Sequence, residues 1–293
     1  MKIVEAVEGD IPKLKEFLLP WESSCVTLCS HIRKKKGHIF IVSNQNPDDI
    51  FGVFYFDKTL LYCFPFLEKD NSADKAAAAT AAGLIKEFQS VMMDFLDGKK
   101  LCCLNGSAKA GQIIIQALEQ NGNAPYQTNN YNTMELLQTP LPPPEKLSCD
   151  DEIKRCTDPD AELEYLLPLQ KMYMAKEVAP AGKQVTDLEA SAQLKSILKD
   201  QLCFALWTDG EVVAKANTNA IGFDYVQLGG VYTHPLYRKN YYAWNLVYTI
   251  CTRVLKTGRK LSLFVKERNN PANELYKRIG FVPGGKYIIA YFK

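Results

Sequence analysis

The sequence predicts an α/β protein built from two similar halves, and three observations lead to this prediction. First, a chain of 293 residues of which 47% are hydrophobic is long for one domain and sufficient for two. Second, a proline-rich run divides the chain near its middle. Third, segments of strand and helix character alternate in the second half, and the first half can be read in a similar order, which predicts a duplicated unit of about 145 residues.

The dividing run is Thr-Pro-Leu-Pro-Pro-Pro-Glu at residues 139–145. Prolines lack an amide donor and fix φ, so consecutive prolines form an extended connector that neither a helix nor a sheet absorbs. We therefore expect one domain at residues 1–138, a linker at 139–149 and a second domain at 150–293.

Hydrophobic periodicity in the second half predicts the order strand, two helices, three strands, helix, strand, helix and strand. Apolar residues recur at spacings of three and four in the helices, and the strands are short apolar runs between turn residues. The expected elements are Glu152–Cys156, Ala161–Glu177, Asp187–Lys199, Leu202–Trp207, Glu211–Ala216, Tyr225–Thr233, Ala243–Val254, Leu261–Val265, Pro271–Ile279 and Tyr287–Phe292.

Capping and turn residues support these boundaries. Asp187 can cap the second helix, because its carboxylate accepts hydrogen bonds from free first-turn amides. Glycine tolerates positive φ, so Gly210 favours a hairpin between the two strands that flank it. Gly258 and Gly280 end the two later helices, and Pro271 opens the last one.

The first half follows a similar order, which is the basis for expecting an internal repeat. Its expected elements are Ile3–Val7, a helical region from Ile11 to just before Lys34, His38–Val42, Phe51–Phe56, Leu60–Phe66, Ala77–Leu96, Leu101–Leu104, Gln112–Gln120 and Asn132–Leu137. Matching Gly122 to Gly280 places Leu118 opposite Tyr276, so the first copy has an apolar residue where the second has a phenol.

Composition excludes several protein classes. The longest nearly apolar stretch, Ala76–Ile85, is too short for a membrane span of about 20 residues, and the N-terminus lacks the apolar core of a secretory signal. We expect a cytoplasmic protein without a membrane partner. Nine cysteines, an odd number, then favour reduced thiols that pack in the core.

Charge is distributed unevenly along the chain. Residues 1–150 hold 15 Lys and Arg against 18 Asp and Glu, whereas residues 151–293 hold 20 against 15. Between Arg238 and Arg278 there are ten basic residues and only two acidic ones. This segment is a candidate anion-binding face, although charge alone fits a solvated set of helix and loop residues as well.

The segment from Leu228 to Ala243 runs from a strand through a loop to a helix N-terminus. The first-turn amides of a helix lack partners and lie at the positive end of its dipole, and Arg238 and Lys239 add charge beside them. This arrangement can cradle a diphosphate. Any strand-loop-helix unit offers free amides, however, so the loop alone fits a plain connection too.

A second motif follows. The pattern N-x-x-A-x-x-L-Y-x-x-x-G-F is met at Asn269, Ala272, Leu275, Tyr276, Gly280 and Phe281. This segment resembles the C-terminal signature of the GNAT superfamily of N-acetyltransferases. Upstream, V-Y-T-H-P-x-Y-R at residues 231–238 looks like the acetyl-CoA strand of this family and the start of its R/Q-x-x-G-x-G/A loop. Arg238 and Ala243 match that loop, but Tyr241 stands where the family has its middle glycine.

The resemblance covers residues 150–293 and implies a mixed, mostly antiparallel sheet flanked by helices. It also implies that residues 1–138 are a degenerate copy of the same fold, as in tandem GNAT proteins. The implied cosubstrate is acetyl-CoA, and the implied acceptor is an amine. The implied cofactor-binding residues are Val231, Tyr232, Thr233, Arg238, Lys239, Asn240, Tyr241, Tyr242, Ala243, Asn269 and Tyr276.

Tyr276 is the implied catalytic acid, which would protonate the departing CoA thiolate. A phenol with a pKa near ~10 can donate a proton to an emerging thiolate, so the residue type fits, although Tyr276 could also simply pack on the sheet. For the base that accepts the amine proton we select Glu177, with His234 as the second choice. The structural alternatives are that Glu177 is a solvated acid at a helix end and that His234 is a turn residue. At Tyr241 we expect an ordinary negative φ, because other residue types then replace glycine without strain.

Other constellations favour structural roles. Cys25, Cys29 and His31 lie on an apolar helical pattern, so we expect core packing and no metal site. The basic run at residues 33–36 is too short for a nucleic-acid surface. Two other functions stay open, namely a catalytically weak acyl-CoA-binding or regulatory module and a structural interaction protein. The expected assembly is a monomer or a homodimer.

Overall fold

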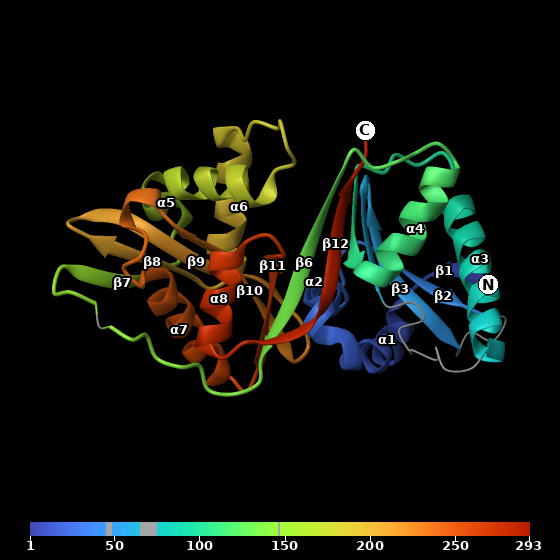
Figure 1. Cartoon of the computed structure of the whole chain (residues 1–293), viewed down its shortest axis with the longest axis horizontal. Helices are drawn as coiled ribbons and strands as arrows, with labels where there is room; N and C mark the ends of the chain where they lie inside the picture. The colour runs from blue at the N-terminus through green and yellow to red at the C-terminus, as the bar shows by residue number, and fades with distance from the viewer. Residues whose placement is uncertain (45–48, 65–74, 146) are drawn as a thin grey trace. The chain divides into compact units, whose positions relative to one another are not determined.

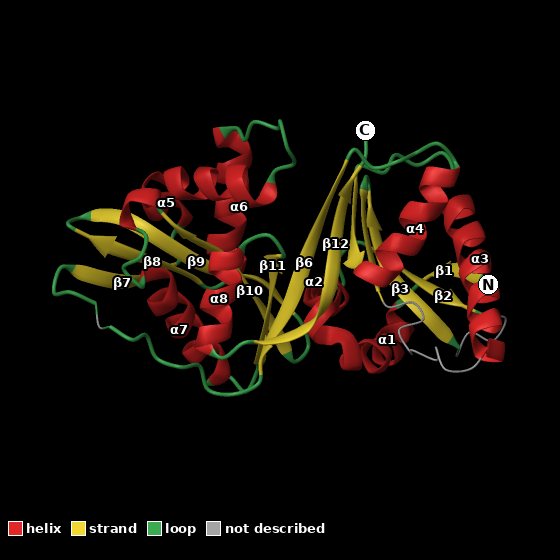
Figure 2. Cartoon of the chain, viewed as in Figure 1, coloured by secondary structure: helices red, strands yellow, loops and turns green. Residues whose placement is uncertain are grey.

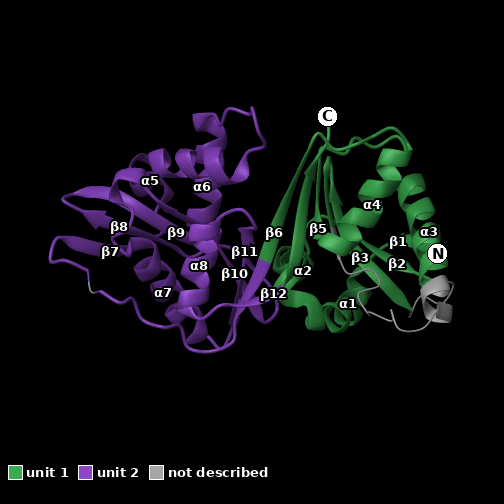
Figure 3. Cartoon of the chain, in the orientation of Figure 1, with its two compact units in different colours: residues 1–132, 285–293 green, residues 133–284 purple. Residues whose placement is uncertain are grey.

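The computed structural model describes residues 1–44, 49–64, 75–145 and 147–293 (Figure 1). It divides into two compact units (Figure 3). Unit 1 comprises Met1–Asn132 and Gly285–Lys293, and unit 2 comprises Thr133–Gly284. In each unit, helices flank a sheet that is mostly antiparallel (Figure 2).

Unit 1 has the strand order β1-β2-β3-β4-β5-β12. Its sheet is antiparallel except between β4 and β5, which are parallel. The predicted strand Leu60–Phe66 corresponds to β4, and its last two residues lie outside the described part of the chain. The elements of this half are β1 (Lys2–Glu5), α1 (Ile11–Leu18), α2 (Glu22–Lys34), β2 (His38–Ser43), β3 (Ile50–Asp57), β4 (Leu60–Phe64), α3 (Lys75–Leu96), β5 (Cys103–Ser107), α4 (Ala108–Gln120) and β6 (Gln127–Leu136).

The last strand of the chain, β12 (Val282–Tyr291), completes the sheet of unit 1. Residues Tyr287–Tyr291 pair with β5, and Ile288, Ala290 and Phe292 are buried in the core of unit 1. An added Cβ at Gly111 of α4 would overlap the Ile288 side chain, so glycine is required where α4 crosses this strand. The sequence places the whole of residues 150–293 in one domain; the compact units differ from this because β12 finds its hydrogen-bonding partner in β5.

The last strand of the N-terminal half, β6, extends into unit 2, just as β12 extends into unit 1. Its residues Thr133–Leu136 belong to unit 2, where β6 is the neighbour of β11 (Lys260–Lys266). Met134 and Leu136 are buried in the core of unit 2, and the Tyr225 hydroxyl donates a hydrogen bond to the Glu135 carboxylate at 3.0 Å. The two halves of the chain therefore exchange their last strands.

Unit 2 has the strand order β6-β11-β10-β9-β8-β7, in which β10 and β11 pair in parallel and the strands from β10 to β7 pair antiparallel. The predicted element order of this half is confirmed. Among the described helices, none is long and apolar enough to cross a membrane. The elements are β7 (Asp151–Cys156), α5 (Pro159–Tyr173), a π-helical turn (Met174–Val178), α6 (Asp187–Asp200), β8 (Cys203–Thr208), β9 (Glu211–Ile221), β10 (Tyr225–Thr233), a 3-10 turn (Pro235–Tyr237), α7 (Tyr242–Leu255), β11 and α8 (Asn270–Ile279).

Local signals in the sequence set most of these boundaries. Asp209 and Gly210 both have positive φ, as the two-residue hairpin between β8 and β9 requires. Gly280 ends α8 in a left-handed conformation with φ 114°. The expectation for Asp187 is wrong: Thr186 is the cap of α6, because its hydroxyl and the Glu189 carboxylate satisfy each other's backbone amides in a capping box.

The proline-rich linker is bound to unit 2 along part of its length. The Leu141 N–H donates to the Ile279 carbonyl at 2.8 Å, and the indole N–H of Trp244 donates to the Leu141 carbonyl at 3.0 Å. Leu141 thus bridges the end of α8 and the start of α7. The absence of amide donors on the neighbouring prolines leaves Leu141 as the residue that can make both bonds.

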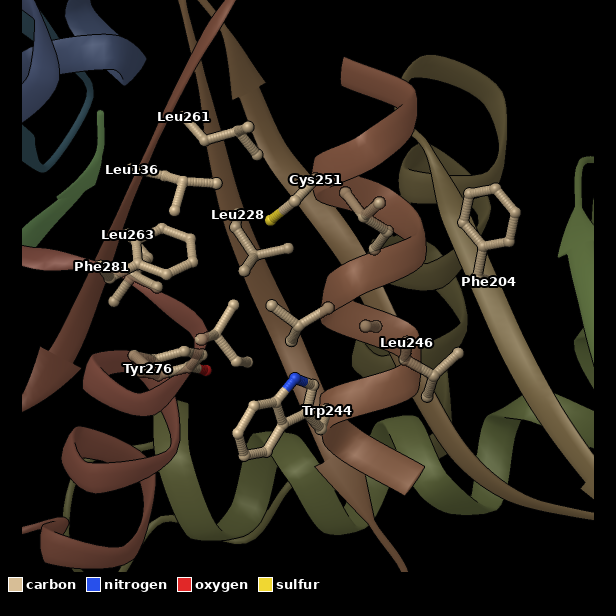
Figure 4. Close-up of a cluster of buried hydrophobic side chains, with 14 of the residues drawn as sticks. Leu136, Phe204, Leu228, Trp244, Leu246, Cys251, Leu261, Leu263, Tyr276 and Phe281 are labelled. Atoms are coloured by element: carbon tan, nitrogen blue, oxygen red, sulfur yellow. The ribbon is translucent and has the colours of Figure 1, made fainter. Parts of the chain in front are cut away.

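The core of unit 2 lies where α7 and α8 cover the sheet (Figure 4). The apolar stripe of α7 packs on β8 to β11, with Leu246, Val247 and Ile250 fully buried. A smaller cluster on the opposite face joins α5 and α6 to β7 and β8. The ends of β10 and β11 are therefore enclosed between two layers of helices.

Candidate functional site

The strands β10 and β11 separate partway along their length. They pair in parallel from Tyr225–Leu228 to Lys260–Leu263. Beyond this register, β10 continues to Thr233 and β11 to Lys266 without further pairing between them. Backbone groups on the facing edges of the two strands are thus available to an extended ligand, which could bind in the manner of an added strand.

A β-bulge lies where the two strands separate. The register of β10 against β9 shifts between Gly229 and Tyr232, and Gly230 has φ 59°. An added Cβ at Gly230 would overlap the Asn217 side chain, so this position requires glycine for its φ and for its close contact. At the bulge, Val231 has no Cα partner in β9 or in β11.

The loop after β10 has the backbone form of an anion-binding nest. Lys239 and Tyr241 have positive φ values of 71° and 56°, and Asn240 lies between them. Alternating backbone conformations of this kind turn successive N–H groups toward one point. Tyr242 and Ala243 follow as the first turn of α7, whose amides point out of the helix end.

The expectation of a negative φ at Tyr241 is wrong. Tyr241 is the residue before α7 and has a left-handed backbone, with φ 56° and ψ 11°. Its ring packs against the core of unit 2 and lies 6.4 Å from the Trp244 ring in an edge-on contact. Packing of the ring compensates for a backbone conformation in which glycine is favoured.

We predict that Tyr241→Gly changes acetyl-CoA affinity less than fivefold, because the backbone already has the conformation that glycine prefers. The substitution relieves backbone strain of about 1 kcal/mol and removes ring packing of a similar size. Calorimetric titration with acetyl-CoA and a thermal melt test this prediction. A tenfold gain in affinity would show instead that the Tyr241 ring crowds the anion site.

Arg238 folds back onto the end of β10. Its Nε donates to the Thr233 carbonyl at 3.3 Å, and its guanidinium carbon lies 5.8 Å from the centre of the Tyr232 ring. The Thr233 carbonyl, which the resemblance assigns to the pantetheine arm, therefore accepts a hydrogen bond from Arg238 in this structure. The Tyr242 hydroxyl donates to Asp151 at 3.0 Å, which fixes the start of α7 to β7.

Tyr276 lies in the core of unit 2 with 8% of its surface exposed. Its ring contacts Phe281 edge-on at 5.8 Å, and both rings lie in the buried cluster that Figure 4 shows. Burial raises the pKa of Tyr276 above its usual value, and the nearby Tyr173, Glu177 and Cys251 raise it further. The phenol thus holds its proton throughout the neutral pH range.

Asn269 caps α8, since its side-chain oxygen accepts the Ala272 amide at 3.3 Å. Asn273, one turn later, donates its side-chain amide to the Lys266 and Asn269 carbonyls at 3.0 and 2.8 Å. These bonds fix the start of α8 against the end of β11. The position of Tyr276 is set by this connection.

Glu177 lies in the π-helical turn after α5 and forms an ion pair with Lys266 at the end of β11, with 3.5 Å between Oε2 and Nζ. The Lys266 side chain is 7% exposed and that of Glu177 is 25% exposed. Burial lowers the pKa of Lys266, and the Glu177 charge opposes this shift. Glu177 is therefore a partly buried, paired carboxylate near Tyr276, unlike a solvated helix-end acid.

The remaining candidates lie apart from this group. The His234 amide donates to the Val213 carbonyl at 2.9 Å, and its ring faces Tyr237, with 5.8 Å between ring centres. In unit 1, the Cys25 and Cys29 sulfurs face each other at 3.7 Å, whereas the His31 ring stacks on Tyr55 at 4.1 Å. The two cysteines thus contact each other, and His31 packs on a different residue.

Two polar residues near the point where β10 and β11 separate were missed at the sequence level. Burial raises the pKa of Tyr173, at the end of α5, to about 12, and the nearby Gly230 backbone opposes this shift. Lys215, on β9, is fully buried. A lysine between the apolar residues of Val-Val-Ala-Lys-Ala-Asn could have indicated this role, because charged residues are seldom buried without a specific partner.

Comparisons with known proteins concern the family and the fold of the chain. Residues 169–281 match the family model described as the acetyltransferase (GNAT) family. This part of unit 2, which contains the separated strands, the loop and α8, is therefore a GNAT domain. No curated protein matches the sequence.

Solved structures extend the similarity to the whole chain. A Drosophila protein is 10% identical with a TM-score of 0.67, covering 99% of this chain and 98% of its own. A GCN5-related N-acetyltransferase from Sphaerobacter thermophilus is 14% identical with a TM-score of 0.58, covering 98% and 94%. A tandem GNAT protein from the clavulanic acid biosynthesis pathway is 11% identical with a TM-score of 0.54, covering 99% and 97%. The chain thus has the fold of two GNAT-like domains.

Proposed function

We propose that unit 2 is an acetyl-CoA-dependent N-acetyltransferase that acts on a primary amine. The observation that carries this proposal is the separation of β10 from β11 at a glycine bulge, directly followed by an anion nest at the N-terminus of α7. An extended arm that ends in a diphosphate fits this sequence of features. Membership of residues 169–281 in the GNAT family supports acyl transfer in general.

The backbone of Val231 and Thr233 would pair with the pantetheine arm, and the pyrophosphate would lie against the amides of residues 239–243. For this contact, Arg238 exchanges the Thr233 carbonyl for the phosphate oxygens, which form stronger charge-assisted bonds. The Tyr232 side chain packs β10 against α5, since its ring centre lies 6.4 Å from that of Tyr173. Asn269 keeps its side-chain NH₂ group for the cofactor while its oxygen caps α8.

The reaction is a direct transfer. The neutral amine attacks the thioester carbon, the new C–N bond forms, the C–S bond breaks, and the amine loses one proton while the thiolate gains one. Tyr276 supplies the proton to the thiolate, and its raised pKa keeps that proton available. Glu177 accepts the amine proton, directly or through water, and its pairing with Lys266 orients the carboxylate.

A catalytically weak acyl-CoA-binding module is the second candidate, and one observation favours it. Among the described residues, the Tyr276 hydroxyl has no hydrogen-bond partner, and it lies in an apolar cluster. Binding without turnover would follow if the phenol did not reach the sulfur. Saturable acetyl-CoA binding without amine-dependent release of CoA would identify this module.

We predict that replacing Arg238 and Lys239 together with Ala weakens acetyl-CoA binding by about 1–3 kcal/mol, because two cations beside the pyrophosphate are lost. The loss should shrink as salt is raised, since the exposed part of the interaction is screened. Isothermal titration at two salt concentrations measures both effects.

A matched control removes two exposed lysines, Lys195 and Lys199, from α6, which changes the net charge equally. We expect this double variant to bind acetyl-CoA as the wild type does. Equal dissociation constants for the wild type and the Arg238/Lys239 variant would place the pyrophosphate elsewhere.

A further inference from the structure

Two cysteines of unit 2 lie directly opposite each other on neighbouring strands. Cys156 is the last residue of β7 and Cys203 is the first residue of β8, and the antiparallel register pairs their Cα atoms. Both side chains are buried, with 2% and 0% of their surface exposed. Because opposite residues point to the same face of a sheet, both thiols lie in the cluster that α5 and α6 cover.

This register meets the distance requirement of a disulfide. Directly opposite Cα atoms in an antiparallel pair lie about 4.5 or 5.5 Å apart, depending on whether the two residues exchange backbone hydrogen bonds. A disulfide joins residues whose Cα atoms are about 4.4–6.8 Å apart, so both cases lie within its range. The two cysteines are free thiols in this structure. A bond between them therefore needs no rearrangement of the strands.

An amine lies beside Cys203 on the next strand. The register of β8 against β9 pairs Cys203 with Asn217 and Ala205 with Lys215, so Lys215 is the diagonal neighbour of Cys203. The Lys215 side chain is fully buried, and its Nζ lies 2.9 Å from Asn217 Oδ1, which brings the amine to the register of Cys203. Two thiols and an amine thus form a buried row across β7, β8 and β9.

The pKa shifts in this row favour transfer of a proton from Cys203 to Lys215. Burial lowers the pKa of Lys215, and the two thiols oppose this shift. The Cys156 thiol and Lys215 lower the pKa of Cys203, against the effects of burial and of Glu162 on α5. Cys203 itself and burial raise the pKa of Cys156. Because the thiolate is the reactive form of cysteine, Cys203 reacts first with an oxidant and Cys156 resolves the product.

A second buried cysteine pair has a different neighbour. In unit 1, the Cys25 and Cys29 sulfurs are 3.7 Å apart, and their side chains are 2% and 0% exposed. The Cys25 thiol and burial raise the pKa of Cys29, and the nearby Glu22 carboxylate raises it further. The two pairs are matched in burial, but an amine accompanies one and a carboxylate the other. We therefore expect the pair in unit 2 to be the more reactive.

Cys156 lies at the end of an edge strand. β7 is the outermost strand of its sheet, and Arg155 and Thr157, on either side of Cys156, are exposed. Ends of elements with exposed neighbours open at a lower free-energy cost than the centre of a sheet. A small oxidant can therefore reach the two thiols while the rest of unit 2 stays folded.

We propose that Cys156 and Cys203 form a redox modification site, at which hydrogen peroxide produces a disulfide that low-molecular-weight thiols reduce again. This inference is independent of the proposed function. The disulfide closes the segment 157–202, which holds α5, the π-helical turn with Glu177, and α6. The modification thus ties together the two ends of the helical layer that covers this face of the sheet.

The oxidation has two steps. Lys215 accepts the Cys203 proton, the thiolate sulfur attacks one peroxide oxygen and the O–O bond breaks; the departing hydroxide takes the proton from Lys215 and leaves as water. The Cys156 sulfur then attacks the resulting sulfenic acid, the S–S bond forms and the S–O bond breaks, and the hydroxide leaves as water with the Cys156 proton. Two thiols and one peroxide give one disulfide and two waters, with sulfur oxidised and peroxide reduced.

The test treats the reduced full chain with hydrogen peroxide, blocks the remaining thiols with N-ethylmaleimide and identifies unreduced peptides by mass spectrometry. We expect a peptide pair joined through Cys156 and Cys203, which dithiothreitol separates, whereas Cys25 and Cys29 remain thiols. The exposed Cys149 reports that the oxidant was active. Free Cys156 and Cys203 after oxidation of Cys149, or a Cys25–Cys29 disulfide that forms equally fast, would overturn the inference.

Cys156→Ser and Cys25→Ser are matched variants, because each removes one buried sulfur. We expect Cys156→Ser to form no disulfide and to accumulate sulfinic acid at Cys203, and we expect Cys25→Ser to form the disulfide at the wild-type rate. Lys215→Met should slow disulfide formation about tenfold or more, because the thiolate fraction falls. An unchanged rate would contradict the role of the amine. If Lys215→Met does not fold, the serine variants and the wild type still test the site.

Melting curves test the closure of the segment 157–202. A disulfide that closes a long loop removes conformations from the unfolded chain and so stabilises the folded one. We expect the oxidised wild type to melt several degrees above the reduced protein, and we expect peroxide to leave the melting temperature of Cys156→Ser unchanged. Equal melting temperatures of the two wild-type forms, with the disulfide present by mass, would contradict the closure.

Discussion

Replacing Tyr276 with Phe is expected to lower turnover roughly 10²-fold while acetyl-CoA affinity stays within a few fold, because the acid is removed and the ring is kept. Tyr276 follows the connection that Asn273 fixes between β11 and α8, and burial holds its proton by raising its pKa. Phenylalanine preserves the contact with Phe281. We therefore expect kcat to decrease and KM to stay close to the wild-type value.

Steady-state kinetics must be accompanied by a melting curve. Because the Tyr276 hydroxyl has no hydrogen-bond partner among the described residues, we expect little loss of stability from its removal. Tyr248→Phe is a matched control, because Tyr248 is a partly buried residue of α7 outside the proposed site. Equal turnover in Tyr276→Phe and the wild type would assign Tyr276 to core packing.

Replacing Ile288 with Ala is expected to destabilise unit 1 by about 2–5 kcal/mol, although Ile288 lies near the C-terminus of the chain. Ile288 is 2% exposed, pairs with Gly106 of β5 and contacts Gly111 of α4. Truncation leaves a cavity in the core of unit 1. Hydrogen exchange followed by mass spectrometry should show faster exchange in β5 and α4.

Ile279→Ala is the control for this prediction. Ile279 is close to Ile288 in sequence and fully buried, but it belongs to the core of unit 2. We expect it to accelerate exchange in α7 and β11 instead. If Ile288→Ala accelerated exchange only in segments of unit 2, the exchange of last strands would be contradicted.

Short-range signals made much of the fold predictable. The strand Tyr225–Thr233 has the predicted bounds, and Gly280 ends α8 as expected. Apolar periodicity and glycine or proline at element ends depend on neighbouring residues, so they can be read from the sequence. The strand exchange could not be predicted, because the alternation of β12 gives its buried face but not the strand that it pairs with.

The residues of the candidate site that belong to a sequence motif could be predicted. The features that depend on how the fold packs could not. Arg238, Asn269 and Tyr276 entered the candidate site because the motifs that contain them resemble those of the GNAT family. The positive φ of Tyr241 was missed, because residue type alone indicates a conformation that ring packing overrides here. Lys215 was missed because a lone lysine in a strand is usually exposed, and only the fold brings it to the Gly230 carbonyl.

The strand exchange also changes how the two halves can be studied. A fragment that ends at residue 138 lacks β12, and with it the buried Ile288, Ala290 and Phe292 of unit 1. Binding experiments therefore require the full chain. Point substitutions in unit 1 and unit 2 can assign acetyl-CoA binding to either unit.

Amine-dependent release of CoA from acetyl-CoA tests the acetyltransferase proposal most directly. The full chain is incubated with acetyl-CoA and a panel of primary amines, free thiol is followed over time, and the products are identified by mass. We predict that at least one amine accelerates thiol release and gains an acetyl group, and that Tyr276→Phe slows this release. Saturable acetyl-CoA binding with no thiol release above background for any amine would contradict catalysis and leave unit 2 as a binding module.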